Sequence, residues 1–313
     1  MMRFILGRVG AAVPTLLLVT IAVFTMMRMI PGDPAAVMLG DLATPDMVAV
    51  MRSRMGLDQP LPVQYIDWLT SMIRGDFGTS IANGEPVLPL MLERFQVSAT
   101  IVVMAVALAA IIAVPAGMYA AWRQGSAADL GIVATSTLLL SIPSFWLGLM
   151  ILLVFGLWLR WFPVIGFVGV ADDWASRLGA LAMPVATLLL VEMGAILRMA
   201  RASTIEVLRQ EYITHARAKG LSEARVLRRH AFRNAFAPTW TLIGLILGAL
   251  LGGIAVTETV FSIPGLGRLL VEAIYTRDYP VVQGCILMIA VVYVVLNLII
   301  DLLYPVFDPR VVR

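Results

Sequence analysis

The hydrophobic residues of this sequence gather into six runs that contain few charges. A helix of about 20 apolar residues crosses the hydrocarbon core of a bilayer, and each run is long enough to do so. The runs lack the alternation of barrel strands, and lipid cannot satisfy an open backbone. We therefore predict an all-α integral membrane protein with six transmembrane helices. They cover Val9–Met29, Val97–Ala121, Leu130–Leu157, Leu178–Leu197, Pro238–Phe261 and Val281–Tyr304.

The first run resembles a signal peptide only in its preceding arginines. It is about twice as long as a signal-peptide core, and it is followed by "MIPGDP" rather than by a small-residue cleavage site. We interpret it as a retained membrane helix.

A long segment with its own helical punctuation separates the first two runs. Thr44 suits the N-cap of a helix, Pro45 its first turn and Gly56 its end, and a second helix is expected from Pro62 to Gly75. The stretch "PVLPLMLERF" then leads into the second membrane helix. We predict a folded helical insertion, and the alternative is a passive spacer.

Basic residues predict the orientation of the chain. Six helices place both termini, the link "WRQGSAAD" and the segment at residues 211–234 on one side. That side has the excess of Lys and Arg that marks the cytoplasm, so the insertion is expected outside. The net charge of +3 and the pI near 9.3 have the same explanation and do not indicate a nucleic-acid partner.

The segment "EYITHARAKGLSEARVLRRHAFRN" predicts two helices that meet at a corner. Apolar residues at helical spacing form one stripe before Gly220 and another after Ser222. Gly220 suits the left-handed end of the first helix, and Ser222 can cap the second. We expect the first helix to include residues 200–219. The stripes are Ile205, Leu208, Tyr212 and Ala216, and then Ala224, Leu227, Ala231 and Ala235.

No catalytic or metal-binding pattern is visible. Lys219 is the only lysine and Gly220 follows it, which excludes the GxxxxGK[ST] phosphate-binding loop. His215 and His230 form no HExxH motif, and Cys285 is a single cysteine. We expect a chain that is not an enzyme and binds no metal and no cofactor itself.

Three acidic residues lie in or near the apolar runs. Asp301 and Glu258 are near helix ends, whereas Glu192 is deeper. Ionisable groups in membrane helices are candidates for function by default. We take Glu192 and Glu258 as possible translocation-pathway residues, and the alternative is a structural hydrogen bond.

The corner segment resembles the EAA loop of ABC-importer permeases. Glu211 matches the start of that loop and Gly220 its glycine, but the downstream Ile-x-Leu-Pro is replaced by His230, Phe232 and Arg233. That version is usual in the peptide-transport branch, which six further stretches resemble. They are "GLDQPLPVQY", "RGDFGTS", "SIPSFWLGL", "ETVFSIPGLGRLL", "RDYPVVQG" and "NLIIDLLYPVFDPR".

The chain thus resembles the dipeptide/oligopeptide (peptide/nickel) permease family, specifically the partner with the long first external loop. The resemblance implies a type I (MetI-like) importer core. Residues 1–96 would form the first membrane helix and the external helical loop. Residues 97–313 would form the permease core, with a coupling loop at about 201–236.

The resemblance also implies partners and a coupling site. The expected partners are a second homologous permease, two cytoplasmic ATPase subunits that hold ATP and Mg, and an external peptide-binding protein. The chain itself would lie in the bacterial inner membrane as a multi-pass protein. The residues that match the coupling loop are Glu211, Ala216, Arg217, Ala218, Lys219, Gly220, Leu221, Ser222 and Arg225.

Other functions compete with peptide import. The same kind of permease can serve glutathione or nickel complexes. An autonomous secondary carrier would have internal repeats, and no convincing repeat is found here. A membrane-embedded enzyme would need a nucleophile with its base, or metal ligands, inside the bilayer.

Overall fold

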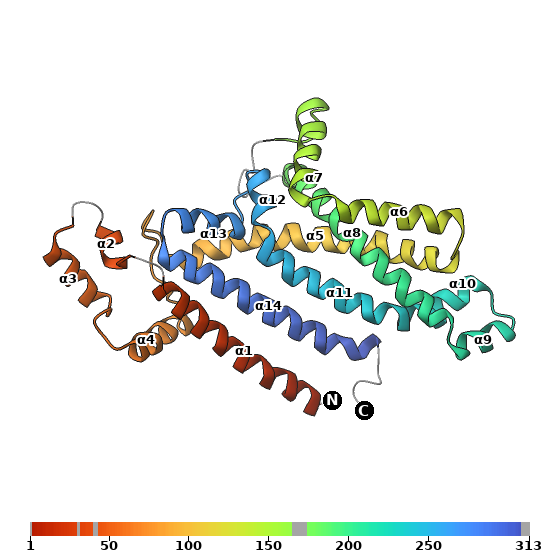
Figure 1. Cartoon of the computed structure of the whole chain (residues 1–313), viewed down its shortest axis with the longest axis horizontal. Coiled ribbons are helices and arrows are strands. Elements are labelled where there is room, and N and C mark those ends of the chain that lie inside the picture. The colour runs from red at the N-terminus through yellow and green to blue at the C-terminus, as the bar shows by residue number, and fades with distance from the viewer. Residues whose placement is uncertain (1, 30–31, 40–42, 165–173, 308–313) are drawn as a thin grey trace.

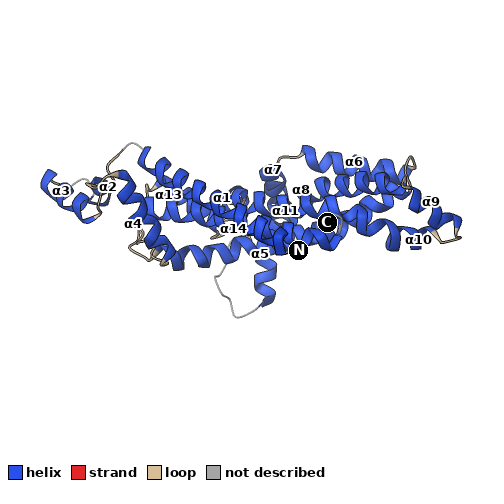
Figure 2. Cartoon of the chain, turned by 90° about the horizontal axis from the view of Figure 1, so that it is seen from below, coloured by secondary structure: helices blue, strands red, loops and turns tan. Residues whose placement is uncertain are grey.

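The computed structural model describes residues 2–29, 32–39, 43–164 and 174–307, and the regular elements in these ranges are all helices (Figures 1 and 2). The long helices are α1 (Met2–Met29), α5 (Val87–Trp122), α8 (Trp174–Leu208), α11 (Phe232–Gly253) and α14 (Tyr279–Phe307). The shorter ones are α2 (Pro34–Leu39), α3 (Pro45–Arg54), α4 (Leu61–Ile73), α6 (Ala127–Ser141), α7 (Ser144–Ile151), α9 (Glu211–Ala218), α10 (Glu223–Arg225), α12 (Ala255–Val260) and α13 (Leu266–Tyr275). Two π-helical stretches are η1 (Leu152–Trp158) and η2 (Val226–Ala231).

The long helices form a bundle along the long axis of the molecule, with α9 and α10 at one end and α2–α4 at the other (Figure 1). Helices α5 and α8 pack against each other at its centre, where Ile101 and Ile196 are fully buried. A Cβ atom on Gly117 would lie 2.6 Å from the carbonyl oxygen of Leu197. The two backbones can approach this closely only because residue 117 has no side chain.

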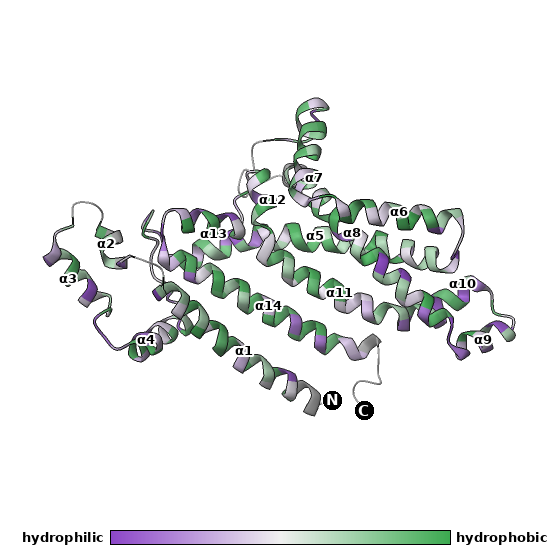
Figure 3. Ribbon diagram, viewed as in Figure 1, coloured by the Kyte–Doolittle hydropathy of each residue, from purple (hydrophilic) through white to green (hydrophobic). Residues whose placement is uncertain are grey.

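The described residues contain five helices that are long and apolar enough to cross a membrane, and a bent pair of helices makes a possible sixth span. The five are Leu6–Met29, Val87–Trp122, Leu178–Leu208, Glu223–Gly253 and Tyr279–Pro305, and the pair is Ala127–Ser141 with Ser144–Trp158. All six predicted runs therefore lie in apolar helices. Large apolar side chains such as Leu18, Ile111 and Val295 are exposed, as expected of lipid-facing helices. Hydrophobic residues predominate along the long helices of the bundle (Figure 3).

The run at Leu130–Leu157, predicted as one helix, is broken into two helices. The chain bends by 98° between α6 and α7. Ile142 and Pro143 have extended backbones, with ψ angles of 123° and 133°. Proline lacks an N–H group and disfavours helical geometry in the residue before it, so α6 ends here. Helix α7 therefore leaves the direction of the bundle (Figure 1).

The helix predicted at Pro238–Phe261 also differs in its bounds. It begins earlier, because the apolar helix is continuous from Glu223, and α11 ends at Gly253. A short separate helix, α12, follows Ile254. Gly252 and Gly253 have a low helix propensity, which accounts for an end at this place.

The helical insertion is confirmed. Helix α3 begins after Thr44, whose side chain accepts a hydrogen bond from the Met47 amide at 3.4 Å. Gly56 and Gly75 follow α3 and α4 with positive φ angles of 66° and 83°. Helix α2 was not predicted, because six residues are too few to show a period. The "MIPGDP" stretch, expected to follow the first membrane helix, lies partly outside the described residues, at 30–31.

Helix α4 packs against the end of α1. The hydroxyls of Thr20 and Tyr65 are hydrogen-bonded at 2.8 Å. The ring of Phe24 lies 5.5 Å from that of Tyr65 and 5.8 Å from that of Trp68. The insertion is thus anchored to the bundle. The domain boundary expected at residues 96 and 97 falls inside α5, which runs without a break from Val87 to Trp122.

Candidate functional site

The basic segment forms a helical corner at one end of the bundle (Figure 1). We define the helical corner as residues 211–231, which comprise α9, the turn at Gly220, α10 and η2. The prediction that the first helix is continuous over residues 200–219 is wrong, because α8 ends at Leu208 and Gln210 is extended with ψ 146°. Helix α9 turns aside here, which lets its apolar side pack against η2.

A small apolar core holds the helical corner together. Ile213, Ala216, Val226 and Ala231 are buried against one another. Partly buried leucines cover them, among them Leu221. Ala216, expected at the coupling surface, therefore points inward and supports the corner rather than facing a partner.

Gly220 adopts the left-handed conformation that the sequence predicts, with φ 77°. A Cβ atom at this position would have no heavy atom of the chain within 4 Å. A side chain would thus be strained by the backbone angle but not crowded by its own protein. Ser222 stands at the N-cap of α10, as predicted, although its side chain makes no capping hydrogen bond.

An ion pair spans the corner. The Arg217 Nε atom donates to Glu223 Oε1 at 2.8 Å, and a second bond joins Nη2 to Oε2 at 3.2 Å. Both side chains are more than a third exposed, so the pair contributes on the order of 0.2–1 kcal/mol. Arg217 is thereby held across the turn.

The remaining predicted coupling residues form the outer surface of the corner. Six of them are exposed and Leu221 is half-buried. The exposed ones are Glu211, Ala218, Lys219, Gly220, Ser222 and Arg225. Arg228 and Arg229 of η2 are exposed as well, so the surface has a basic character.

Polar contacts tie the corner to the bundle. The Asn234 amide donates to the Tyr212 hydroxyl at 2.8 Å, which links α9 to α11. The Ser203 hydroxyl donates to the Ala235 carbonyl at 2.7 Å, which links α8 to α11. Movement of the corner would therefore act on both long helices.

A buried ion pair between α6 and α8 was not predicted from the sequence. The Arg201 guanidinium donates to both oxygens of Asp129, at 2.6 and 2.7 Å. Asp129 is only 3% exposed and also accepts a bond from the Gly125 amide at 3.0 Å. We call Asp129 and Arg201 the α6–α8 clamp.

Glu258 is fully buried beside the start of α13. Its carboxylate accepts hydrogen bonds from the Ser98 hydroxyl and from the Arg268 amide, the latter at 2.7 Å. The Ser98 oxygen in turn accepts from the Leu266 amide at 2.8 Å. A Cβ atom on Gly265 would collide with the carboxylate. Glu258 thus caps α13, and its side chain has no exposed surface.

Glu192 has a different environment. It is half-buried near the middle of α8, and we find no hydrogen-bond or ion-pair partner for it among the described residues. Its position shares a helix face with Ile196, Met199 and Ser203, at spacings of four, seven and eleven. Asp301, by contrast, pairs with Arg8 at 2.8 Å.

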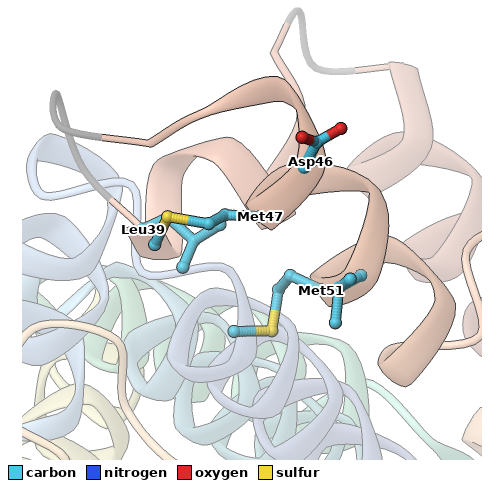
Figure 4. Close-up of a pocket in the computed structure, with 5 residues that line it drawn as sticks. Leu39, Asp46, Met47 and Met51 are labelled. Atoms are coloured by element: carbon cyan, nitrogen blue, oxygen red, sulfur yellow. The ribbon is translucent and has the colours of Figure 1, made fainter.

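The insertion has an apolar pocket of its own. A cavity of about 330 Å³ lies between α2 and α3 (Figure 4). The side chains of Leu39, Met47 and Met51 line it, together with Val50 and Asp46. Across the described residues we find no group of three or more His, Cys, Asp or Glu residues that could hold a metal ion.

The comparisons with known proteins cover the whole chain. The family described as "Binding-protein-dependent transport system inner membrane component" matches residues 113–313, and a companion model of the N-terminal membrane component matches residues 1–104.

A protein of Brucella suis biovar 1 (strain 1330), provisionally named a peptide transport system permease protein, is 41% identical over 99% of both chains. The dipeptide transport system permease protein DppB of Escherichia coli (strain K12) is 36% identical, again over 99% of both chains. The crystal structure of an amino acid ABC transporter with histidines superposes with a TM-score of 0.48 and 18% identity, covering 71% of this chain and 94% of that one.

Proposed function

Because the chain belongs to the family of binding-protein-dependent transport system inner membrane components, we propose that it is the permease subunit of an ATP-driven importer of dipeptides and other short peptides. The names of its full-length relatives support peptides as the substrate class. The apolar spans suit a multi-pass protein of the bacterial inner membrane.

The complete importer contains further chains. A second homologous permease completes the pathway, two cytoplasmic ATPase subunits bind ATP and Mg, and an external binding protein delivers the peptide. This arrangement is supported by the sequence, in which the only lysine cannot form a phosphate-binding loop. The helical corner and both termini face the cytoplasm, and the insertion faces the periplasm, because the basic residues concentrate on the corner side.

The single observation that carries the proposal is the exposed corner around Gly220. The turn projects from a fixed apolar core, it is free of contacts at its tip, and Lys219, Arg225 and Arg228 surround it with positive charge. Such a surface fits a groove with acidic residues on an ATPase subunit, since complementary charge favours and steers docking. Movement of the ATPases would then reach α8 and α11 through the corner.

Glu192 is the pathway residue that this function favours. An ionisable side chain that lacks a partner inside a membrane helix is costly unless water or substrate reaches it. Glu192 meets this condition, whereas Glu258 is occupied by the cap of α13. We assign Glu192 to the polar lining of the pathway.

The experiment that tests the proposal is Gly220→Val in the complete complex, reconstituted in vesicles with the binding protein and dialanine. Valine disfavours a positive φ and places a branched side chain at the tip, so we expect substrate-stimulated ATP hydrolysis and uptake to fall at least tenfold. Both activities are measured together with co-purification of the ATPase subunits.

Gly84→Val is the matched control. Gly84 has φ 74°, and a Cβ atom there would likewise meet no heavy atom within 4 Å, but this glycine lies in the insertion. The substitution causes the same local strain, on the order of 1–3 kcal/mol, without touching the corner. Full activity of the Gly220→Val complex would remove the corner from its coupling role.

A further inference from the structure

A charged cavity lies between the N-terminal part of α5 and the start of α13, at the end of the bundle that has the insertion. Its volume is about 180 Å³, and three of its six lining residues are charged. The lining consists of Arg94, Pro264, Gly265, Arg268, Leu269 and Glu272. In the proposed orientation this cavity opens on the periplasmic side.

The residues that line the cavity carry two positive charges and one negative charge, and the buried carboxylate of Glu258 lies behind Gly265. Arg268 is paired, because its Nε atom donates to Glu272 Oε1 at 2.7 Å. Arg94 has no such partner among the described residues, and its Nε atom is buried without a hydrogen bond. A buried donor left unpaired is costly, and an anion in the cavity would supply the missing acceptor.

The wall of the cavity is held rigidly. The amides of Leu266 and Arg268 at the start of α13 are already taken by Ser98 and Glu258, so they are not available to a ligand. Gly265, which lines the cavity, lies against the buried carboxylate of Glu258. Any anion here would therefore be bound by the arginines on a fixed frame, not by the helix end.

We propose that this cavity binds the C-terminal carboxylate of an incoming peptide, with Arg94 as the main ligand and Arg268 beside it. A guanidinium matches a carboxylate with two parallel N–H···O bonds. Pockets that enclose whole small ligands measure about 300–1,000 Å³, so a cavity of this size admits one end of a peptide only. The inference rests on the proposed import of peptides and identifies the chemical group that the permease recognises.

The test compares a free acid with its amide. The complex of permeases and ATPases is placed in nanodiscs without the binding protein, and equilibrium binding of radiolabelled dialanine and of dialanine amide is measured. We expect the complex to bind the acid at least tenfold more tightly than the amide. Arg94→Gln should abolish this preference, and Arg94→Lys should retain part of it, because it keeps the charge but not the paired geometry.

Arg74→Gln is the matched control, since Arg74 is an exposed arginine of the insertion outside the cavity. It should keep the full preference. Co-purification of the subunits shows that each variant is assembled. Equal binding of acid and amide by the unmodified complex, or an unchanged preference in Arg94→Gln, overturns the inference.

A second measurement separates this inference from the proposed function. Dialanine uptake into vesicles with ATP and the binding protein tests import itself. If uptake occurs but the complex binds acid and amide equally, only the proposed carboxylate site is contradicted. If the unmodified complex shows no uptake, both the carboxylate site and the proposed import of peptides are contradicted. A third outcome is that the complex binds acid and amide equally while Arg94→Gln lowers only the dialanine uptake that the binding protein stimulates. In that case the cavity receives an acidic residue of the binding protein, and the inference is wrong.

Discussion

Glu192 and Glu258 are both carboxylates in apolar surroundings, yet their oxygens meet different groups. Those of Glu258 accept hydrogen bonds from Ser98 and from the α13 backbone, while Glu192 has no partner among the described residues. The sequence makes both of them candidates for the pathway and distinguishes them only by depth, since Glu258 lies near a helix end and Glu192 is deeper. The difference in hydrogen bonding depends on Ser98, which lies 160 residues away in the chain and is brought close only by the packing of α5 beside α12 and α13.

Neutralising the two carboxylates should have opposite effects. Glu258→Gln keeps the shape but turns one accepting oxygen into a donor that faces other donors, so we expect a loss of about 1–3 kcal/mol in stability. Glu192→Gln should leave stability unchanged or slightly raised, because a desolvated charge is removed, while peptide uptake falls. Thermal unfolding of the purified chain and vesicle uptake provide the two readings. A destabilised Glu192→Gln protein would show that Glu192 has a structural role instead.

Arg94 shows another limit of interpreting single residues. The pathway candidates from the sequence are acidic residues within or beside the apolar runs. Arg94 is basic and precedes the second run by three positions. Its significance comes from a cavity that it shares with Arg268, which is far away in the chain. Gly220, by contrast, was predictable, because a left-handed helix end is encoded by the local sequence.

At the scale of elements, local composition predicts the helices well and their junctions poorly. Hydropathy located all six apolar segments, and turn residues located α3 and α4. The bend at Pro143 is not predicted from the sequence, because the apolar run continues through it and the length of the run suits a single membrane helix. The break before α9 is not predicted from the sequence, because the apolar stripe continues past Leu208 although the chain turns there.

The α6–α8 clamp makes a prediction about how these elements are joined. Removing one partner, as in Asp129→Leu or Arg201→Met, leaves the other charge unpaired, and we expect a loss on the order of 2–3 kcal/mol. The figure is below that of a fully buried pair, since a quarter of the Arg201 side chain is exposed. The double variant Asp129→Leu/Arg201→Met should lose less than either single variant. The free energy of unfolding in detergent is the quantity to measure.

The exposed pair Arg268–Glu272 is not a clean reference because it lines the anion cavity, so Arg52–Asp33 of the insertion serves as control. Breaking that pair should cost less than about 1 kcal/mol. Additive losses in the double variant of the α6–α8 clamp would show that its two charges do not interact.

At the scale of the whole molecule, the proposed orientation places the two ends of the bundle on opposite sides of the membrane. In a Cys285→Ser background, a cysteine at Glu85 should react with a membrane-impermeant thiol reagent added to intact cells, and one at Ser222 should not. Both positions are exposed, whereas Cys285 is buried, so labelling reports access to each side. Permeabilised cells should label at both sites. The reversed pattern in intact cells would place the corner outside and contradict ATPase docking there.

If an ATPase subunit docks on the helical corner as proposed, the continuous helix from Glu223 to Gly253 can act as a lever. It contains 31 residues, so at 1.5 Å per residue it measures about 46 Å from the rim of the corner to the place where α12 begins. If one end is pushed sideways and the rod tilts by only about 5°, its far end swings by about 4 Å, roughly the width of a peptide backbone. A short stroke delivered by a nucleotide-driven motor at the basic surface would in this way be enlarged at the opposite mouth, next to the residues that hold α13 in place.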